Sequence, residues 1–95
     1  MQADDKQNII EKQKILVTAV SLVVRNLVKQ SGKSGRKISE EYDIGLGVIS
    51  KLDRNLVSDI KLSTLWKLMN AFNISPENFI KMILDNLPKN FNFYE

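Results

Sequence analysis

The stretch "EYDIGLGVISKLDRN", residues 41–55, decides the fold of this chain. Residues 46–54 place the apolar Ile49 and Leu52 three positions apart, on one side of a short helix. Residues 43–45, an aspartate, an isoleucine and a glycine, suit a tight turn before that helix. The stretch therefore predicts the end of one helix, a turn and a second short helix.

The segment before the turn completes this pair of helices. Ser34 is a favourable N-cap for a helix that runs to about Tyr42. Within that helix, Ile38 offers an apolar contact and Ser39 a small side chain, which suits a close crossing with the next helix. Together with Ile44 in the turn, these residues are expected to hold the two helices at a fixed angle.

The rest of the chain is also predicted to be helical, so we assign the all-α class. Proline occurs only at positions 76 and 88, and apolar residues follow a helical period almost throughout. Residues 62–73 have the one-sided apolar pattern of a surface helix. Ser75 and Pro76 predict the start of a last helix that ends near Asn86 and buries Phe79, Ile80, Ile83 and Leu84.

A long first helix is predicted from about Lys6 to about Ser31, apolar over most of its circumference. The β-branched residues between 15 and 24 leave two alternatives, a strand or a break near Gln13 into two helices. A helix with so little polar surface needs covering on two sides, most simply by its own domain and by a second copy of the chain. The expected dimerisation residues are Ile9, Leu16, Val20 and Val23.

Composition excludes several classes of function. The 95 residues fit one domain and contain neither cysteine nor histidine, which removes disulfides, thiol nucleophiles, imidazole bases and most zinc sites. The acids show no paired spacing suited to catalysis or metal binding. We therefore expect no enzyme, no cofactor and no metal.

Hydropathy argues against a membrane-spanning protein, and the placement of charge is compatible with a phosphate-bearing partner. The apolar run at 15–24 is about half the length that spans a bilayer, so we expect a cytoplasmic protein. The net charge is +3, and residues 29–37 carry cations but no acid. Such a bias favours the phosphate backbone of a nucleic acid, but acids are interleaved from residue 40 onward, so a merely solvated surface is an equal alternative on charge alone.

Residues 34–79 resemble the helix-turn-helix core of the Cro/C1-type repressor family, also called the XRE family. The resemblance rests on the cap, the inner residues of the first short helix, "ISKLDRN" at 49–55 and "LSTLWKLMNAFNIS" at 62–75. It implies a five-helix lambda-repressor-like domain, here with an extended N-terminal helix. We divide the chain into an N-terminal helical extension (1–20), the helix-turn-helix domain (21–87) and an aromatic C-terminal tail (88–95).

The resemblance also implies which residues would face DNA. Bases would be faced by Gly35, Leu46, Gly47 and Ser50, and phosphates gripped by Ser34, Arg36, Lys51, Arg54 and Asn55. The base-facing set lacks the Asn, Gln and Arg side chains that read adenine or guanine with two hydrogen bonds. What remains is apolar contact of Leu46 or Val48 with a thymine methyl, the Ser50 hydroxyl, close approach at Gly47, and DNA shape.

Two further expectations concern contacts within and between chains. The family pairs an arginine of the first helix with an acid near the end of the third helix, which is Asp53 in this chain. Val28 occupies the position of that arginine, so Arg25, one turn earlier, is the candidate partner. Trp66 is expected to pack or to contact another subunit rather than to stack on bases. The aromatic tail is expected to fold back onto the core or onto a neighbouring subunit.

The leading interpretation is a DNA-binding transcriptional regulator, a repressor that binds a two-fold operator in double-stranded DNA as a homodimer. One alternative is an antitoxin, in which the extra helical length before residue 20 clamps a toxin. Another is a protein-interaction module on the same scaffold that no longer reads DNA. The sequence leaves open the operator, the regulated gene, any effector ligand and the partner of the first helix.

Overall fold

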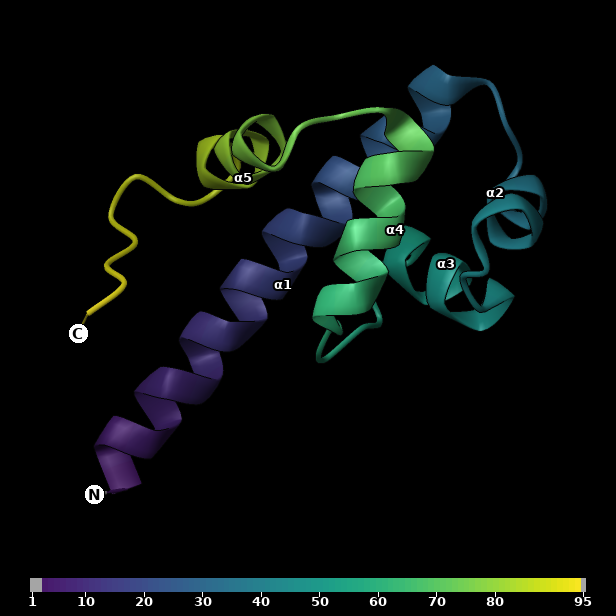
Figure 1. Ribbon diagram of the computed structural model, residues 1–95. Coiled ribbons are helices and arrows are strands. Elements are labelled where there is room, and N and C mark those ends of the chain that lie inside the picture. Colours follow the sequence, from purple (N-terminus) through teal and green to yellow (C-terminus); the bar gives the residue numbers. More distant parts are fainter. Residues whose placement is uncertain (1–2, 95) are drawn as a thin grey trace.

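All regular secondary structure in the described part of the chain is helical. The computed structural model describes residues 3–94, and the side chains of residues 7–94. Residues 1–2 of the expected extension and residue 95 of the tail lie outside this range. The described residues contain no strand and form five helices, α1 Ala3–Ser31, α2 Gly35–Tyr42, α3 Leu46–Asp53, α4 Leu62–Phe72 and α5 Pro76–Asp85 (Figure 1). The all-α assignment is confirmed.

Helix α1 is continuous, so neither the strand nor the break near Gln13 occurs. Its 29 residues correspond to a length of about 43 Å, which matches the longest dimension of the molecule, 44 Å. Its C-terminal half runs through the domain, whereas its N-terminal half extends away from the other helices (Figure 1). α1 is not apolar enough to span a bilayer, and the other described helices are too short.

Local signals account for the helix ends. The hydroxyls of Ser34 and Ser75 accept hydrogen bonds from backbone N–H groups three residues later, at 3.1 and 3.2 Å. Asp43 and Asn73 end α2 and α4 in the left-handed conformation, with φ of 54° and 53°. These caps account for both ends of α2, the end of α4 and the start of α5. All four shorter helices end within one residue of the expected positions.

One core joins all five helices. Val24 and Leu27 of α1 lie in it beside buried residues of the other helices, Ile38, Ile49, Leu52, Leu68, Phe79 and Ile83. Leu68 and Phe79 are completely buried. α1 packs against α3, α4 and α5, while α2 packs against α3 and α4. The long β-branched helix is therefore stabilised by tertiary burial, which outweighs its modest helix propensity.

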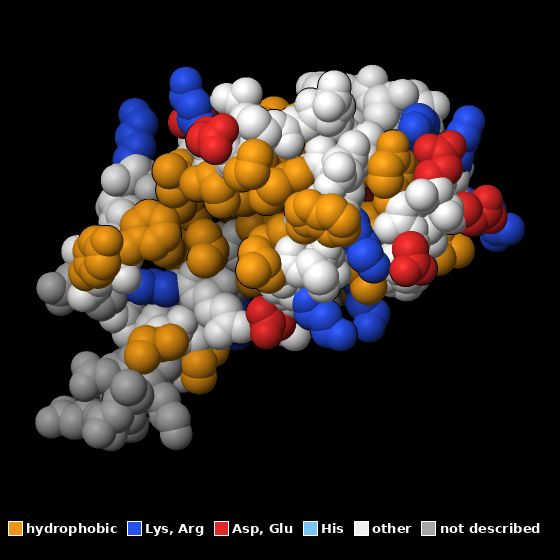
Figure 2. Space-filling model, in the orientation of Figure 1, with side chains coloured by type: hydrophobic (Ala, Val, Ile, Leu, Met, Phe, Trp, Pro, Cys, Tyr) orange, Lys and Arg blue, Asp and Glu red, His pale blue; other side chains and the backbone are white. Residues whose placement is uncertain are grey.

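Of the four residues of α5 that were expected to be buried, two are exposed. Phe79 and Ile83 are buried, but Ile80 and Leu84 are each 47% exposed. α5 packs mainly against α1, so only the side of α5 that carries Phe79 and Ile83 is covered. Figure 2 shows the result, an apolar surface that spreads over α5 and the neighbouring helices.

The expected dimerisation residues do not share an exposed surface. Val20 and Val23 are 7% and 3% exposed and belong to the core of the single chain. Leu16 packs against that core, whereas Ile9 is 52% exposed. Val20 and Val23 are thus buried within the single chain, in which α1 packs against α3, α4 and α5.

The proposed boundary at residue 20 also falls inside the core. Val17, Ala19 and Val20 are buried, so the last residues of the expected extension belong to the packed domain. The tail returns to α1, since Pro88 and Phe91 line a hollow of about 300 Å³ with Lys12 and Ile15. Phe93 and Tyr94 remain exposed, and Phe93 meets Phe91 edge to face with ring centroids 4.9 Å apart.

Candidate nucleic-acid interface

The α2–α3 pair is held by an apolar crossing and a pinned turn. Ile38, Ile44, Ile49 and Leu52 are each 5% exposed or less, as expected for the inner faces of the two helices. The backbone N–H of Ile44 donates to the carbonyl of Ser39 at 3.1 Å. The Ser39 hydroxyl donates in return to the carbonyl of Ile44. Ser39 therefore closes the turn by hydrogen bonding, in addition to leaving space for the crossing.

A lysine of α4 anchors the same turn, and sequence reasoning missed it. Nζ of Lys67 donates to the carbonyl of Asp43 at 2.8 Å and lies 3.5 Å from the carboxylate oxygen of the same residue. Asp43 is the left-handed residue at which α2 ends, so Lys67 ties α4 to the point where the chain reverses. No local pattern predicts this contact, because the two residues are 24 positions apart.

The glycines at 35 and 47 have opposite surroundings. A Cβ atom at Gly35 would lie 2.9 Å from Cγ2 of Ile49, so position 35 faces α3. The missing side chain makes room for the crossing, and the expectation that position 35 faces DNA bases stays a prediction. A Cβ at Gly47 would have no atom within 4 Å. Position 47 is open.

The outward face of α3 is centred on Gly47. At 100° per residue, Gly47, Ser50, Lys51 and Arg54 lie opposite the buried Ile49 and Leu52. On one flank, Leu46 is 45% exposed. On the other flank, Val48 is turned toward a hollow that it lines together with Lys61 and Lys67. The first turn of this face thus projects little, whereas Lys51 in its second turn and Arg54 just after its last residue are long cations.

The residues expected to grip phosphates lie at the start of α2 and at the end of α3. Ser34 and Arg36 are exposed at the start of α2, where the first backbone N–H groups have no partner one turn earlier. Lys51 and Arg54 are exposed at the end of α3, and Nε of Arg54 donates to the carbonyl of Ser50 at 3.4 Å. Asn55 follows with a positive φ of 55°. All five residues are therefore accessible.

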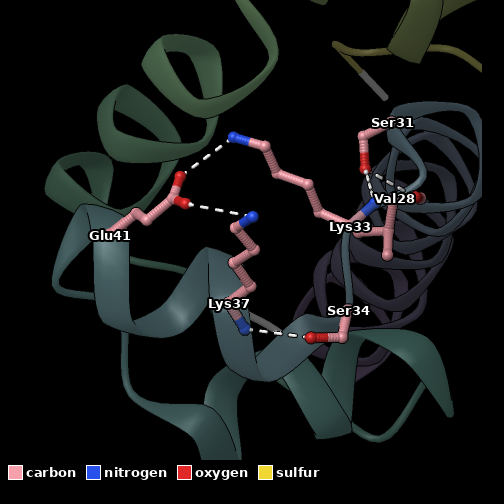
Figure 3. A network of polar contacts seen from close by, with 6 residues as sticks. All are labelled: Val28, Ser31, Lys33, Ser34, Lys37 and Glu41. Atoms are coloured by element: carbon pink, nitrogen blue, oxygen red, sulfur yellow. Dashed lines mark hydrogen bonds and ion pairs between the residues drawn. The ribbon is translucent and has the colours of Figure 1, made fainter.

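A second basic group beside α2 is already paired within the chain (Figure 3). Nζ of Lys33 lies 2.9 Å from one carboxylate oxygen of Glu41, and Nζ of Lys37 lies 4.0 Å from the other. The hydrogen bond from Lys33 lowers the pKa of the Glu41 carboxyl, and the same bond raises the pKa of Lys33. The sequence places Lys33 and Lys37 in a run of cations, but it does not show that both pair with Glu41.

The scaffold contact expected between Arg25 and Asp53 is present but loose. Nε of Arg25 lies 3.9 Å from a carboxylate oxygen of Asp53, and both side chains are about half exposed or more, at 49% and 62%. An exposed pair of this kind contributes little to stability. The angle between α1 and α3 is therefore set by the apolar core.

The described residues contain no cluster of three acidic, histidine or cysteine side chains that could hold a metal ion. The site consists of a small-residue helix face bordered by cations, carried on two helices whose relative angle is fixed. This arrangement is a helix-turn-helix.

A comparison with solved structures agrees with the fold. No family model and no curated protein match the chain. Among solved structures, the chain is similar to the restriction-modification controller protein C.Esp1396I, solved as a tetramer in complex with its natural 35 base-pair operator. The TM-score is 0.67 and the sequence identity 20%, and the match covers 75% of this chain and 92% of that one. At this identity the likeness establishes a shared fold.

Proposed function

We propose that this chain is a DNA-binding transcriptional regulator, a repressor of the Cro/C1 (XRE) type that binds a two-fold operator as a dimer. One observation carries the proposal. The inner face of α3 is buried at the crossing with α2, whereas its outward face is exposed and has cations at its border. A major groove is wide enough to admit one helix, and the bordering cations suit the phosphates on either side.

The structural neighbour supports this proposal. That protein is a controller solved on its own operator, and the shared fold covers 92% of its chain. Transfer of its role to this chain is an inference from fold to function, so it needs the agreement of the site. The exposed Arg36, Lys51 and Arg54 supply that agreement.

Dimerisation follows from the geometry of a two-fold operator, whose half-sites lie about 34 Å apart, one turn of the double helix. The exposed apolar side chains of α4 and α5 suit a subunit contact better than the four residues expected on α1. These side chains of α4 and α5 are Leu62, Trp66, Ile80 and Leu84, and each is between 47% and 80% exposed. Trp66 of α4 and Pro76 at the start of α5 line one hollow, so the two helices border each other there.

A protein partner is a second candidate, favoured by the N-terminal half of α1. Ile9 and Ile10 are 52% and 44% exposed on a segment that extends beyond the domain. An antitoxin arm or an interaction module would use such a segment. Binding to DNA and binding to a toxin through this arm are compatible with each other.

Selection from a random duplex library at about physiological salt tests the proposal, because nonspecific affinity is weak there. Enrichment of an inverted repeat is the expected result. If no sequence is enriched, the DNA-reading function is excluded and the apolar N-terminal half of α1 becomes the surface on which to search for a partner.

A further inference from the structure

We propose that the hollow between the first half of α1 and the returning tail binds a small zwitterion with an apolar body, such as a free amino acid whose side chain is apolar. The hollow has a volume of about 300 Å³, at the lower end of the range for small-molecule sites. The tail lies on the side of α1 away from α2 and α3 (Figure 1). The inference therefore goes beyond the proposed function and does not depend on DNA binding.

Lys12 supplies the positive charge of this site. Its Nζ has almost no exposed surface and no hydrogen-bond partner in the described part of the chain. A buried ammonium group without an acceptor is unfavourable for the protein that carries it. The side chain lines the hollow, and its flexible four-carbon stem lets Nζ turn toward an occupant. A carboxylate in the hollow would supply the missing acceptor.

Glu11 supplies a negative charge to the same lining, so an occupant that is only an anion would meet a like charge. The Glu11 carboxylate accepts one long hydrogen bond, from Nε2 of Gln7 at 3.5 Å, and it has the capacity to accept more. An amino acid carries a carboxylate and an ammonium group on the same carbon atom. The first can pair with Lys12 and the second with Glu11, which satisfies both charges at once.

The rest of the lining selects the body of the occupant. Ile15, Pro88 and Phe91 form its apolar part, and Ile15 is 37% exposed. Asn92 also lines the hollow, and its Oδ1 accepts the backbone N–H of Tyr94 at 3.0 Å, which leaves Nδ2 as a donor for a carboxylate. An apolar wall with a few polar groups is typical of a small-molecule site. An aliphatic or aromatic side chain on the occupant matches that wall.

The test is a titration of the whole, isotope-labelled chain with L-leucine and with L-phenylalanine, followed through the amide chemical shifts in NMR spectra. We expect saturable shifts centred on residues 8–15 and 88–92 with at least one of the two. The dissociation constant should be about 1 mM or lower, which a ligand of this size can reach. Analogues of the bound amino acid that lack the ammonium group or the carboxylate, for L-leucine isocaproate and isopentylamine, should each bind about tenfold more weakly, as the loss of one charged hydrogen bond predicts.

Three variants assign the two charges. Lys12→Met should keep the fold and abolish the saturable shifts, whereas Lys14→Met, which removes the same charge at an exposed position of α1, should bind like the unchanged protein. Glu11→Gln should weaken binding of the amino acid and leave binding of its ammonium-free analogue no weaker. Shifts that stay linear with concentration for both amino acids, or equal binding by Lys12→Met, overturn the inference. An ammonium-free analogue that binds as tightly as the amino acid overturns it too, because Glu11 would then have no part in recognition.

Discussion

Gly35 and Ile49 are in contact across the α2–α3 crossing, where a methyl group at position 35 would come within 2.9 Å of Cγ2 of Ile49. This carbon is bonded directly to Cβ of a side chain that is 5% exposed, so it cannot swing aside without a change of rotamer in the core. The relationship fixes how closely the two helices approach.

Gly35→Ala should therefore destabilise the protein by about 1 to 3 kcal/mol, the usual range for overpacking in a core. Urea unfolding followed by circular dichroism measures the change. Gly47→Ala is the matched control, because it adds the same methyl group to a helix at a position with no neighbour. Equal stability of the two variants would show that the crossing tolerates the methyl group.

Glu41→Gln should strengthen DNA binding. The carboxylate pairs with Lys33 and Lys37 in the free protein, and its removal leaves both cations available for phosphates. Anisotropy titrations across a salt series should give a higher affinity and a steeper salt dependence, by about one unit of slope for each additional phosphate that is neutralised. Glu40→Gln, which changes the net charge equally at the neighbouring exposed position, is the control.

The same pair predicts a dependence on pH. The pKa of Glu41 is lowered in the folded state, so its pairing stabilises the fold above the unfolded pKa and is lost as pH falls through the folded pKa. The pKa of Lys33 is raised, so its share is lost as pH rises through that raised value. Glu41→Gln should therefore remove a small loss of stability in acid and leave the neutral range flat.

Lys12→Met should stabilise the protein. Nζ of Lys12 is buried under the returning tail without a hydrogen-bond partner, and an unsatisfied buried donor costs about 1 to 3 kcal/mol. Methionine keeps the unbranched chain and removes the donor. Lys14→Met, at an exposed position of the same helix, should change the free energy of unfolding little. A loss of stability in Lys12→Met would reveal a favourable interaction of the ammonium group.

Trp66→Ala should weaken self-association about tenfold or more, because large aromatic side chains dominate the energy of subunit contacts. Sedimentation equilibrium measures the dissociation constant of the dimer. Ile9→Ala tests the surface expected on α1 in the same way. If only Ile9→Ala shifts the equilibrium, the N-terminal half of α1, and not the α4–α5 surface, holds the dimer together.

Lys51→Ala should weaken binding by a similar factor on every sequence and flatten the salt dependence by about one unit of slope, as expected when one phosphate is no longer neutralised. Affinity for the selected operator and for an unrelated duplex, each measured at several salt concentrations, checks this. A change confined to sequence preference would instead assign Lys51 to the bases.

The helices and their order could be predicted from the sequence because their signals are local. Ser34 and Ser75 cap helices with their own side chains, and the spacing of Ile38, Ile49, Leu52 and Leu68 shows which face each helix buries. The helix-turn-helix follows from these signals, since only a short turn separates α2 from α3.

Only the tertiary structure decided which neighbour, if any, covers each face. Periodicity groups Ile80 and Leu84 with Phe79 and Ile83, yet a single partner helix buries just one side of α5. Periodicity likewise makes Val20 and Val23 look available to a second chain, although both are buried in the core of their own chain. The contacts of Gly35 with Ile49 and of Lys67 with Asp43 depend on helix packing. The residues in each pair are far apart in the sequence, so no local pattern predicts that they meet.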